Sequence, residues 1–228
     1  MNHRITFPSV HSMGGTPFVA EVSAPTHDLA VREVLEHCAR ESIALEYLHL
    51  HNIQDLKGAR LDGLKLSNCK LTSVDLSGAS LVGARVEHTR MLKVAANSAT
   101  TFDRAWLEDV QLEECALNGW SMRDAVCSGL RLEGTTARGW RVDRTNFDGV
   151  RFISLRGSTR DNTPAAPCDL TGWHMHMALL RSFQDADEVI AASALTDNEK
   201  AAVRTLAVTG SREAAAHYLR GLEAMCAT

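Results

Sequence analysis

The sequence has few aromatic residues and lacks the patterns that mark common enzymes and metal proteins. Aromatic side chains make up 5% of its 228 residues. Gly-x-Gly-x-x-Gly, P-loop and Cys-x-x-Cys patterns are absent from it, so neither a nucleotide site nor a structural zinc site is expected. No Ser-His-Asp or Cys-His group stands in a recognisable context. The sequence therefore predicts a protein that is not an enzyme and binds no cofactor or metal ion.

Long apolar runs are missing as well. No stretch approaches the roughly 20 apolar residues that a bilayer-spanning helix needs. Met1–Val10 lacks the basic region and apolar core of a secretory signal peptide. The charges nearly balance, with 24 Lys and Arg, 28 Asp and Glu, and a formal net charge of -4. We therefore expect a cytoplasmic protein with no membrane contact.

What the sequence does contain is an apolar residue at every fifth position from Ile43 to Phe152. A helix requires apolar residues about every 3.6 positions and a strand about every 2, so this period fits neither element. One-residue slips follow Leu50 and Ala96. The centres of the units are Leu45, Leu50, Leu56, Leu61, Leu66, Leu71, Leu76, Leu81, Val86, Met91, Ala96, Phe102, Leu107, Leu112, Leu117, Met122, Cys127, Leu132, Ala137, Val142, Phe147 and Phe152.

A second inward position lies two residues before each centre and usually carries a small or medium-sized side chain, as at Ala79 and Val110. Two inward residues in five indicate a short extended piece followed by a corner. Four such pieces close a square coil of about twenty residues, and coils stack through backbone hydrogen bonds about 4.8 Å apart. Residues 56–152 therefore predict about five coils, which form a rod about 24 Å long.

The runs Leu56-Lys57-Gly58-Ala59-Arg60-Leu61 and Asp75-Leu76-Ser77-Gly78-Ala79-Ser80-Leu81-Val82-Gly83-Ala84 resemble the pentapeptide-repeat family, whose unit is A-(D/N)-L-x-x. The resemblance covers about 110 residues. It implies a mainly β fold: a right-handed quadrilateral β-helix (a pentapeptide-repeat solenoid of about five coils) with an N-terminal capping helix and a C-terminal helical segment. The chain departs from the family pattern because the middle position often lacks Asp or Asn.

The N-terminal region, residues 1–42, is predicted to be an arm followed by a capping helix, and residues 43–155 form the β-helix. Short strands are expected at Arg4–Phe7 and Pro17–Val22. Asp28 is expected to cap a helix that runs to about Arg40. The helix should cover the first coil, because an open terminal coil exposes unpaired backbone groups and apolar side chains.

The C-terminal region is predicted to contain a linker at 156–170 and a helical domain at 171–228. Gly157, Pro164 and Pro167 indicate the linker. The expected helices cover about 171–183, 186–194, 197–208 and 211–225. The last helix has one apolar face that needs a partner. In the family, a C-terminal helix often pairs two rods, so the resemblance implies a homodimer.

Trp120 and Trp140 stand where the repeat expects a small residue, twenty positions apart. They should therefore stack on one face of the rod. One interpretation, which we favour, is an interior bulge that accommodates both rings. The alternative is a face that opens to dock a partner. The candidate partner-binding residues are Arg104, Trp120, Arg123, Trp140 and Arg144.

The charges of the repeat region exclude both a nucleic-acid-binding surface and a surface that mimics DNA. Residues 46–152 hold 14 Lys and Arg and 14 Asp and Glu. A nucleic-acid-binding surface would need a basic patch, and a mimic of DNA would be strongly acidic. Positive and negative side chains instead share a face, which predicts ion pairs between neighbouring coils; they are Arg60, Arg104, Arg141 and Arg144 with Asp62, Asp103 and Asp143. Direct binding of nucleic acid is not expected.

Cysteines and histidines are interpreted as structural or surface residues. Cysteines on inward positions should be buried thiols rather than disulfides; they are Cys69, Cys115 and Cys127. In two pairs of histidines the members stand two positions apart: His49 with His51, and His174 with His176. The first pair should point outward from a strand. The second lies in a predicted helix, where residues two apart do not face each other.

Two functions are compatible with the sequence. The first is a non-catalytic protein-interaction module, and the family resemblance implies a type II DNA topoisomerase (gyrase or topoisomerase IV) as its partner. The alternative is a secreted or delivered bacterial effector that uses the solenoid as a binding scaffold. Residues 1–27 contain only Arg4 and Glu21 as charges and several Ser and Thr, as an unstructured export signal does. An ordinary N-terminal arm is the simpler interpretation of that segment.

Overall fold

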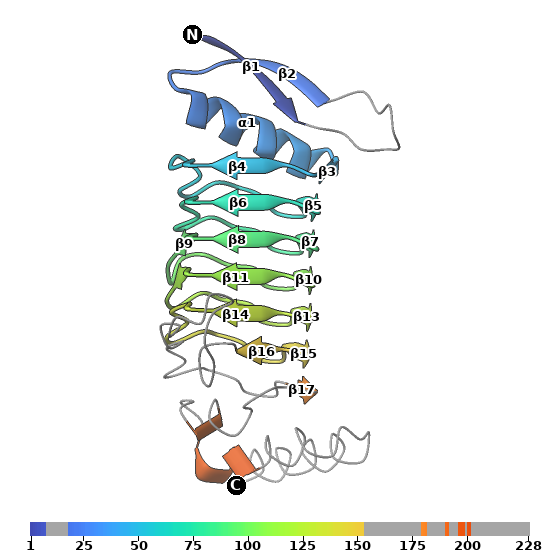
Figure 1. The fold of residues 1–228 in the computed structure, drawn as a ribbon, viewed down its shortest axis with the longest axis vertical. Helices are drawn as coiled ribbons and strands as arrows, with labels where there is room; N and C mark the ends of the chain where they lie inside the picture. Colours follow the sequence, from blue (N-terminus) through green and yellow to red (C-terminus); the bar gives the residue numbers. More distant parts are fainter. Residues whose placement is uncertain (8–17, 153–178, 182–189, 192–195, 199, 202–228) are drawn as a thin grey trace, which may run out of the picture.

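The computed structural model describes residues 1–7, 18–152, 179–181, 190–191, 196–198 and 200–201. Short parallel strands stack into a solenoid with a helix and a hairpin at its N-terminal end (Figure 1). The first sheet, with seven strands, contains β3 (Ala44–Glu46), β5 (Lys65–Ser67), β7 (Arg85–Glu87), β10 (Trp106–Glu108), β13 (Val126–Ser128), β15 (Asn146–Asp148) and β17 (Leu179–Arg181). The second sheet, with six strands, contains β4 (His49–His51), β6 (Lys70–Thr72), β8 (Arg90–Leu92), β11 (Gln111–Glu113), β14 (Arg131–Glu133) and β16 (Arg151–Phe152).

The other two sides of the square coil have shorter pairings. One side holds β9 (Ala95–Ala96) and β12 (Ala116–Leu117), which pair in parallel. The fourth side is a column of isolated parallel bridges from Arg60 to Ser80, Thr101, Ser121 and Arg141. Four sides per turn confirm the square coil that the five-residue period predicts. The right-handed sense of the coil stays a prediction.

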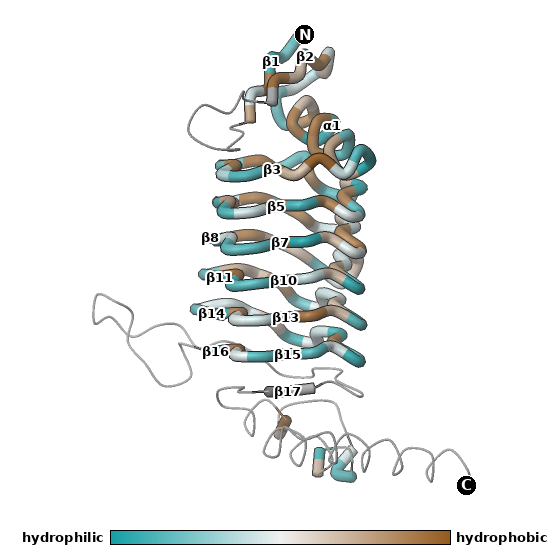
Figure 2. The backbone as a smooth tube through the Cα atoms, turned by 90° about the vertical axis from the view of Figure 1, so that its right-hand side faces the viewer, coloured by the Kyte–Doolittle hydropathy of each residue, from teal (hydrophilic) through white to brown (hydrophobic). Residues whose placement is uncertain are grey.

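The register of the first sheet shows how many turns the chain makes. Leu45 pairs with Leu66, and the column continues through Val86, Leu107, Cys127 and Phe147. These five steps are five turns of the solenoid, as predicted. The tube coloured by hydropathy shows polar and apolar segments alternating along each coil (Figure 2). The apolar residues that recur at every fifth position are therefore the ones that point into the rod.

The predicted centres are buried wherever the structure describes their side chains, with one exception. Ala96 is half-buried, and it lies at the second slip. Arg60 pairs with Ser80, 20 residues on, but Ser80 pairs with Thr101, 21 residues on. This coil therefore holds one additional residue. Thr100 holds the wider turn closed, because its Oγ1 accepts hydrogen bonds from the backbone N–H groups of Asn97 and Gly78.

Each corner requires a backbone conformation that ordinary residues rarely adopt. At every described corner except Ser98, the residue two positions after a centre has a positive φ, for example 66° at Gly58 and 72° at Gly63. In this conformation the corner N–H points at the next coil, as Gly63 N–H does toward the carbonyl of Val82 (2.9 Å). Non-glycine residues also adopt it, among them His88 (46°) and Asp109 (49°). Bonds between coils thus fix the corners as well as the strands.

Buried polar groups inside the rod bond to the preceding coil. Thr100 Oγ1 donates to the carbonyl of Leu76 at 3.0 Å, and Thr135 Oγ1 donates to that of Leu112 at 3.0 Å. Cys115 Sγ donates to the carbonyl of Met91 at 3.3 Å. In each case the acceptor is a central residue of the coil before. Polar side chains are therefore tolerated at the small inward position because their hydrogen bonds are satisfied there.

The helix α1 (His27–Arg40) covers the first coil, as predicted, and its polar side chains bond to the backbone edge of that coil. Asp28 Oδ2 accepts from Gln54 N–H at 2.8 Å, and Glu36 Oε1 accepts from Arg60 N–H at 3.0 Å. Arg32 donates to the carbonyls of residues 57 and 58. These contacts satisfy groups that a further coil would otherwise pair.

The predicted cap residue of this helix was wrong. Thr26 is the N-cap, since its hydroxyl accepts from Leu29 N–H at 3.2 Å. Asp28 lies in the first turn, where its carboxylate is committed to the first coil. Strands β1 (Asn2–Phe7) and β2 (Phe18–Ser23) pair antiparallel and contact the helix. The two expected strands are confirmed, which favours an ordinary arm over an unstructured export signal.

The C-terminal prediction was wrong at Leu179–Arg181. These residues form strand β17, which pairs in parallel with β15, instead of part of a helix over 171–183. The open edge of the last coil offers unpaired backbone groups, and this pairing overrides the local apolar pattern. Residues 190–191, 197–198 and 200–201 are helical. The whole linker, the remainder of the four predicted helices and the expected dimer contact lie outside the described residues.

Candidate protein-binding surface

The two tryptophans of the predicted binding set lie inside the rod. Trp120 is 1% exposed and Trp140 is 0% exposed. Their ring centroids are 5.2 Å apart in an edge-to-face arrangement, and Phe102 packs on Trp120 at 4.5 Å. Trp140 Nε1 donates to the carbonyl of Leu117 at 2.6 Å. The interior bulge is therefore the correct interpretation, and neither ring offers a surface to a partner.

Arg104 and Arg144 are exposed at corners of one column, Arg123 is half-buried one position before the corner residue Asp124, and all three lie among aspartates. Arg144 forms a two-pronged ion pair with Asp124, at 2.5 and 2.6 Å, and Arg123 Nε lies 3.3 Å from Asp143 Oδ2. The bond from Arg144 holds the pKa of Asp124 below its ordinary value, and Arg104 adds to this effect. Ion pairs between neighbouring coils are present, but Arg144 pairs with Asp124 rather than with one of the three aspartates that the sequence pattern indicated.

Two of the aspartates expected in those ion pairs bond to the backbone instead. Asp62 Oδ1 accepts from Ser80 Oγ (2.5 Å) and from the N–H of Val82 (2.9 Å). Asp103 Oδ1 makes the same two bonds to Ser121 and Arg123. A carboxylate beside the corner thus ties each coil to the next, which the charge pattern alone did not reveal.

The feature that sequence reasoning missed is Trp106, which is 43% exposed on the first sheet. The guanidinium of Arg85 lies over its ring, 5.8 Å from the centroid. Its Nε1 donates to Glu108 Oε2 at 3.1 Å. The available signal was its position: Trp106 immediately precedes the centre Leu107, and that position points outward. We refer to Arg85, Trp106 and Glu108 as the Trp106 patch.

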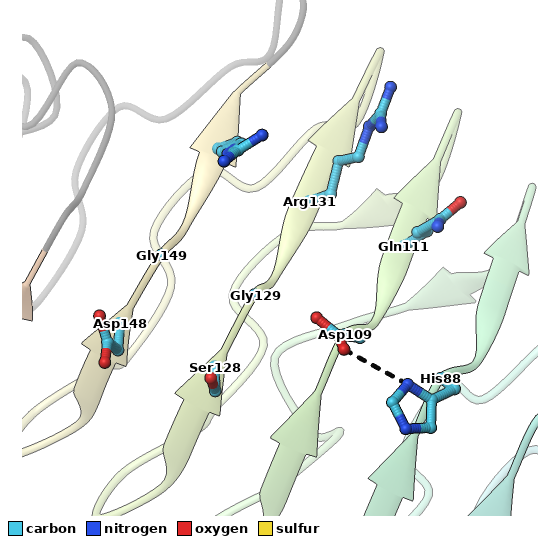
Figure 3. A pocket seen from close by; sticks show the side chains of 9 residues that line it. His88, Asp109, Gln111, Ser128, Gly129, Arg131, Asp148 and Gly149 are labelled. Carbon is cyan, nitrogen blue, oxygen red and sulfur yellow. Dashed lines mark ion pairs between the residues drawn. The ribbon is translucent and has the colours of Figure 1, made fainter.

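A groove lies beside this patch at the corner between the two large sheets (Figure 3). It has a volume of about 690 Å³ and is open to solvent. The groove exists because two consecutive corners of this column, Gly129 and Gly149, have no side chain, whereas His88 and Asp109 occupy the corners before them. Arg131 lines its other side. The groove therefore combines acidic groups (Asp109 and Asp148) with basic groups (Arg131 and Arg151).

The described cysteines lie in the interior of the protein. Four cysteines are free and buried: Cys38, Cys69, Cys115 and Cys127. Burial raises the pKa of the Cys115 thiol to about 11 and raises that of Cys127 as well, so the reactive thiolate form is scarce at neutral pH. His49 and His51 are exposed on β4, as predicted. His174 and His176 lie outside the described residues.

The comparisons with known proteins agree with this fold. The family model for pentapeptide repeats matches residues 55–91 with eight copies. Residues 55–91 therefore carry pentapeptide repeats, as the quoted runs predicted. No curated protein matches it by sequence. Within the described residues, no helix has the length and apolar character that crossing a membrane requires.

Three solved structures of pentapeptide-repeat and resistance proteins are similar to it. Full-length QnrB1, a plasmid-mediated fluoroquinolone resistance protein, is 20% identical over 60% of this chain and 63% of its own, with a TM-score of 0.25. Rfr23 from the cyanobacterium Cyanothece 51142 is 14% identical over 56% and 99%, with a TM-score of 0.26. HetL of Nostoc sp. strain PCC 7120, involved in heterocyst differentiation regulation, is 16% identical over 66% and 88%, with a TM-score of 0.22. The match thus spans less than two thirds of the length of QnrB1.

Proposed function

We propose that the chain is a non-catalytic protein-interaction module that docks a protein partner on the first sheet, with Trp106 as the anchor. One observation carries this proposal: a large aromatic side chain is 43% exposed and is nevertheless held in place from both sides. Tryptophan is the residue type most enriched at the energetic centres of protein interfaces. Among the described tryptophans Trp106 alone is exposed, whereas Trp120 and Trp140 are buried inside the rod.

The rigidity of the rod supports a docking role. Trp106 stands on β10, which pairs in register with β7 and β13 on either side. Its side chain is fixed by the cation over its ring and by the bond to Glu108. A partner would therefore lose little free energy to ordering of the Trp106 patch, because preorganised groups bind at a smaller entropic cost.

The partner that the family resemblance implies is a type II DNA topoisomerase, either gyrase or topoisomerase IV. The balanced charge of residues 46–152 argues against imitation of a DNA duplex. We therefore propose that contact occurs through the Trp106 patch, with Arg104, Arg123 and Arg144 as a second, peripheral contact. The free, buried thiols support a cytoplasmic setting for this interaction.

A supercoiling assay with purified gyrase and topoisomerase IV tests the proposal. Full-length chain at micromolar concentration should alter supercoiling or its inhibition by a fluoroquinolone, and Trp106→Ala should weaken the effect at least tenfold. Tyr47→Ala is the matched control, because Tyr47 is a similarly exposed aromatic residue (45%) on the first coil. No effect of the wild-type chain, or equal effects of both variants, would overturn the proposal.

A further inference from the structure

We propose that His88, Glu108 and Asp109 form a binding site for a divalent transition-metal ion of the Zn²⁺ type. Each residue offers one ligand atom, and these atoms all lie within 4.8 Å of one another. They come from two consecutive coils: His88 follows β7, whereas Glu108 ends β10 and Asp109 follows it. Among the described residues, this is the cluster in which histidine and carboxylate groups meet in this way.

The spacing of the first two ligands already matches a metal site. His88 Nδ1 lies 3.3 Å from Asp109 Oδ2, and the two side chains point toward each other across the corner (Figure 3). With Zn–N and Zn–O bonds of about 2.1 Å, tetrahedral ligand atoms are roughly 3.4 Å apart. The ligand atom of Glu108 lies within 4.8 Å of the other two, so a side-chain adjustment at the strand end completes three ligands.

The backbone that carries the ligands is fixed by bonds between coils. His88 N–H donates to the carbonyl of Glu108 at 2.8 Å, and Asp109 N–H donates to that of Ser128 at 2.8 Å. Trp106 Nε1 donates to Glu108 Oε2 at 3.1 Å. A hydrogen bond from a neighbouring donor to a ligating carboxylate is the usual way in which proteins orient such a ligand. The supporting contacts therefore exist without the ion.

The ligand set selects the type of ion. One imidazole and two carboxylates suit Zn²⁺, Ni²⁺ and Cu²⁺, whereas Mg²⁺ and Ca²⁺ prefer oxygen ligands alone. Two carboxylates at adjacent positions also repel each other, and a dication removes that repulsion. The metal positions that protein atoms do not fill would face the groove, since His88 and Asp109 line it.

Calorimetric titration of the full chain with Zn²⁺ at pH 7.5 tests the proposal. We expect one saturable binding event that His88→Gln, Glu108→Gln or Asp109→Asn each weakens at least tenfold while the melting curve is unchanged. His49→Gln is the matched control, because His49 is an exposed histidine whose partner in register is Lys70 rather than a carboxylate. It should bind Zn²⁺ as the wild type does.

Tryptophan fluorescence reports where the ion binds. Ni²⁺ quenches the emission of nearby indole rings. Titration with Ni²⁺ should therefore quench the emission of Trp106, which is the component that Trp106→Phe removes. Addition of Zn²⁺ should restore this emission, because Zn²⁺ displaces Ni²⁺ from the same site. An absence of binding heat in the wild type would overturn the proposal. Binding that all three ligand variants retain would also overturn it, because the ion would then lie elsewhere in the chain.

Discussion

Glu36 on helix α1 accepts a hydrogen bond from the backbone N–H of Arg60, an edge group of the first coil, at 3.0 Å. The same carboxylate pairs with Arg32 at 2.9 Å, and Arg32 in turn donates to the coil. A side-chain pair thus replaces the backbone pairing that an additional coil would provide. This relationship lets a solenoid end without an exposed edge.

Removal of this carboxylate should destabilise the N-terminal end of the rod. Glu36→Ala leaves the N–H of Arg60 without its acceptor, and we expect a loss of about 1–2 kcal/mol in the free energy of unfolding. Glu33→Ala is the control, since Glu33 is exposed on the same helix. Urea denaturation measures both. Equal stability of the two variants would show that the contact does not contribute.

A charge at a central position should unfold the rod. Leu117 is 1% exposed, and Leu117→Asp would place a carboxylate in an apolar interior without a partner. We expect a loss of at least about 4 kcal/mol, seen by circular dichroism and thermal melting. Lys57→Ala should be nearly silent, because Lys57 is exposed. A small response to Leu117→Asp would contradict the inward assignment.

The two interior tryptophans should differ in their tolerance of phenylalanine. Trp140→Phe removes the donor to the carbonyl of Leu117, whereas Trp120 Nε1 has no hydrogen-bond partner among the described residues. Both variants lose similar volume. We therefore expect Trp140→Phe to be the more destabilising by about 1–3 kcal/mol in chemical denaturation. The reverse order would show that the bond to Leu117 is not formed.

Corner glycines should differ according to the space around them. Gly119 and Gly139 both have positive φ (73° and 65°), so alanine costs about 1 kcal/mol at either position. At Gly119 an added Cβ would also lie 2.9 Å from Ser98 Cβ, whereas at Gly139 nothing lies within 4 Å. Gly119→Ala should therefore lower the melting temperature more than Gly139→Ala. Equal shifts would indicate that the coil relaxes freely at residue 98.

The buried thiols should not react in the folded protein. Burial raises the pKa of Cys38 and Cys115 to about 11, so the thiolate is scarce at pH 8. In a variant with Cys168→Ser and Cys226→Ser, Ellman's reagent should react only after denaturant is added. Fast reaction of the folded variant would contradict the burial of these side chains.

The sequence predicts the rod well because an apolar period of five residues is compatible with one kind of fold. An apolar residue at every fifth position can be buried only if the chain turns a corner in each unit, and the centres from Leu45 to Phe147 are interior accordingly, apart from half-buried Ala96. Local signals were less decisive at the ends. Asp28 and Thr26 are both good cap residues. The structure decides between them, because Asp28 accepts a hydrogen bond from Gln54 N–H of the first coil while Thr26 caps the helix.

The candidate surface was less predictable because outward positions are not periodic. Arg104, Arg123 and Arg144 were expected to bind a partner from their charge alone, but aspartates from neighbouring coils surround them. The sequence pattern predicted only that the Trp106 side chain points outward, not that it lies in a binding surface. The meeting of His88 with Asp109 depends on which corners stack, a register that the second slip shifts by one residue.

Oxidative footprinting of the complex with gyrase tests the central claim most directly. Indole and phenol rings are both oxidised rapidly when exposed, and Trp106 and Tyr47 are similarly exposed in the free chain. The account predicts that gyrase protects Trp106 from oxidation while Tyr47 reacts as before. Unchanged oxidation of Trp106 in a saturated complex would contradict it.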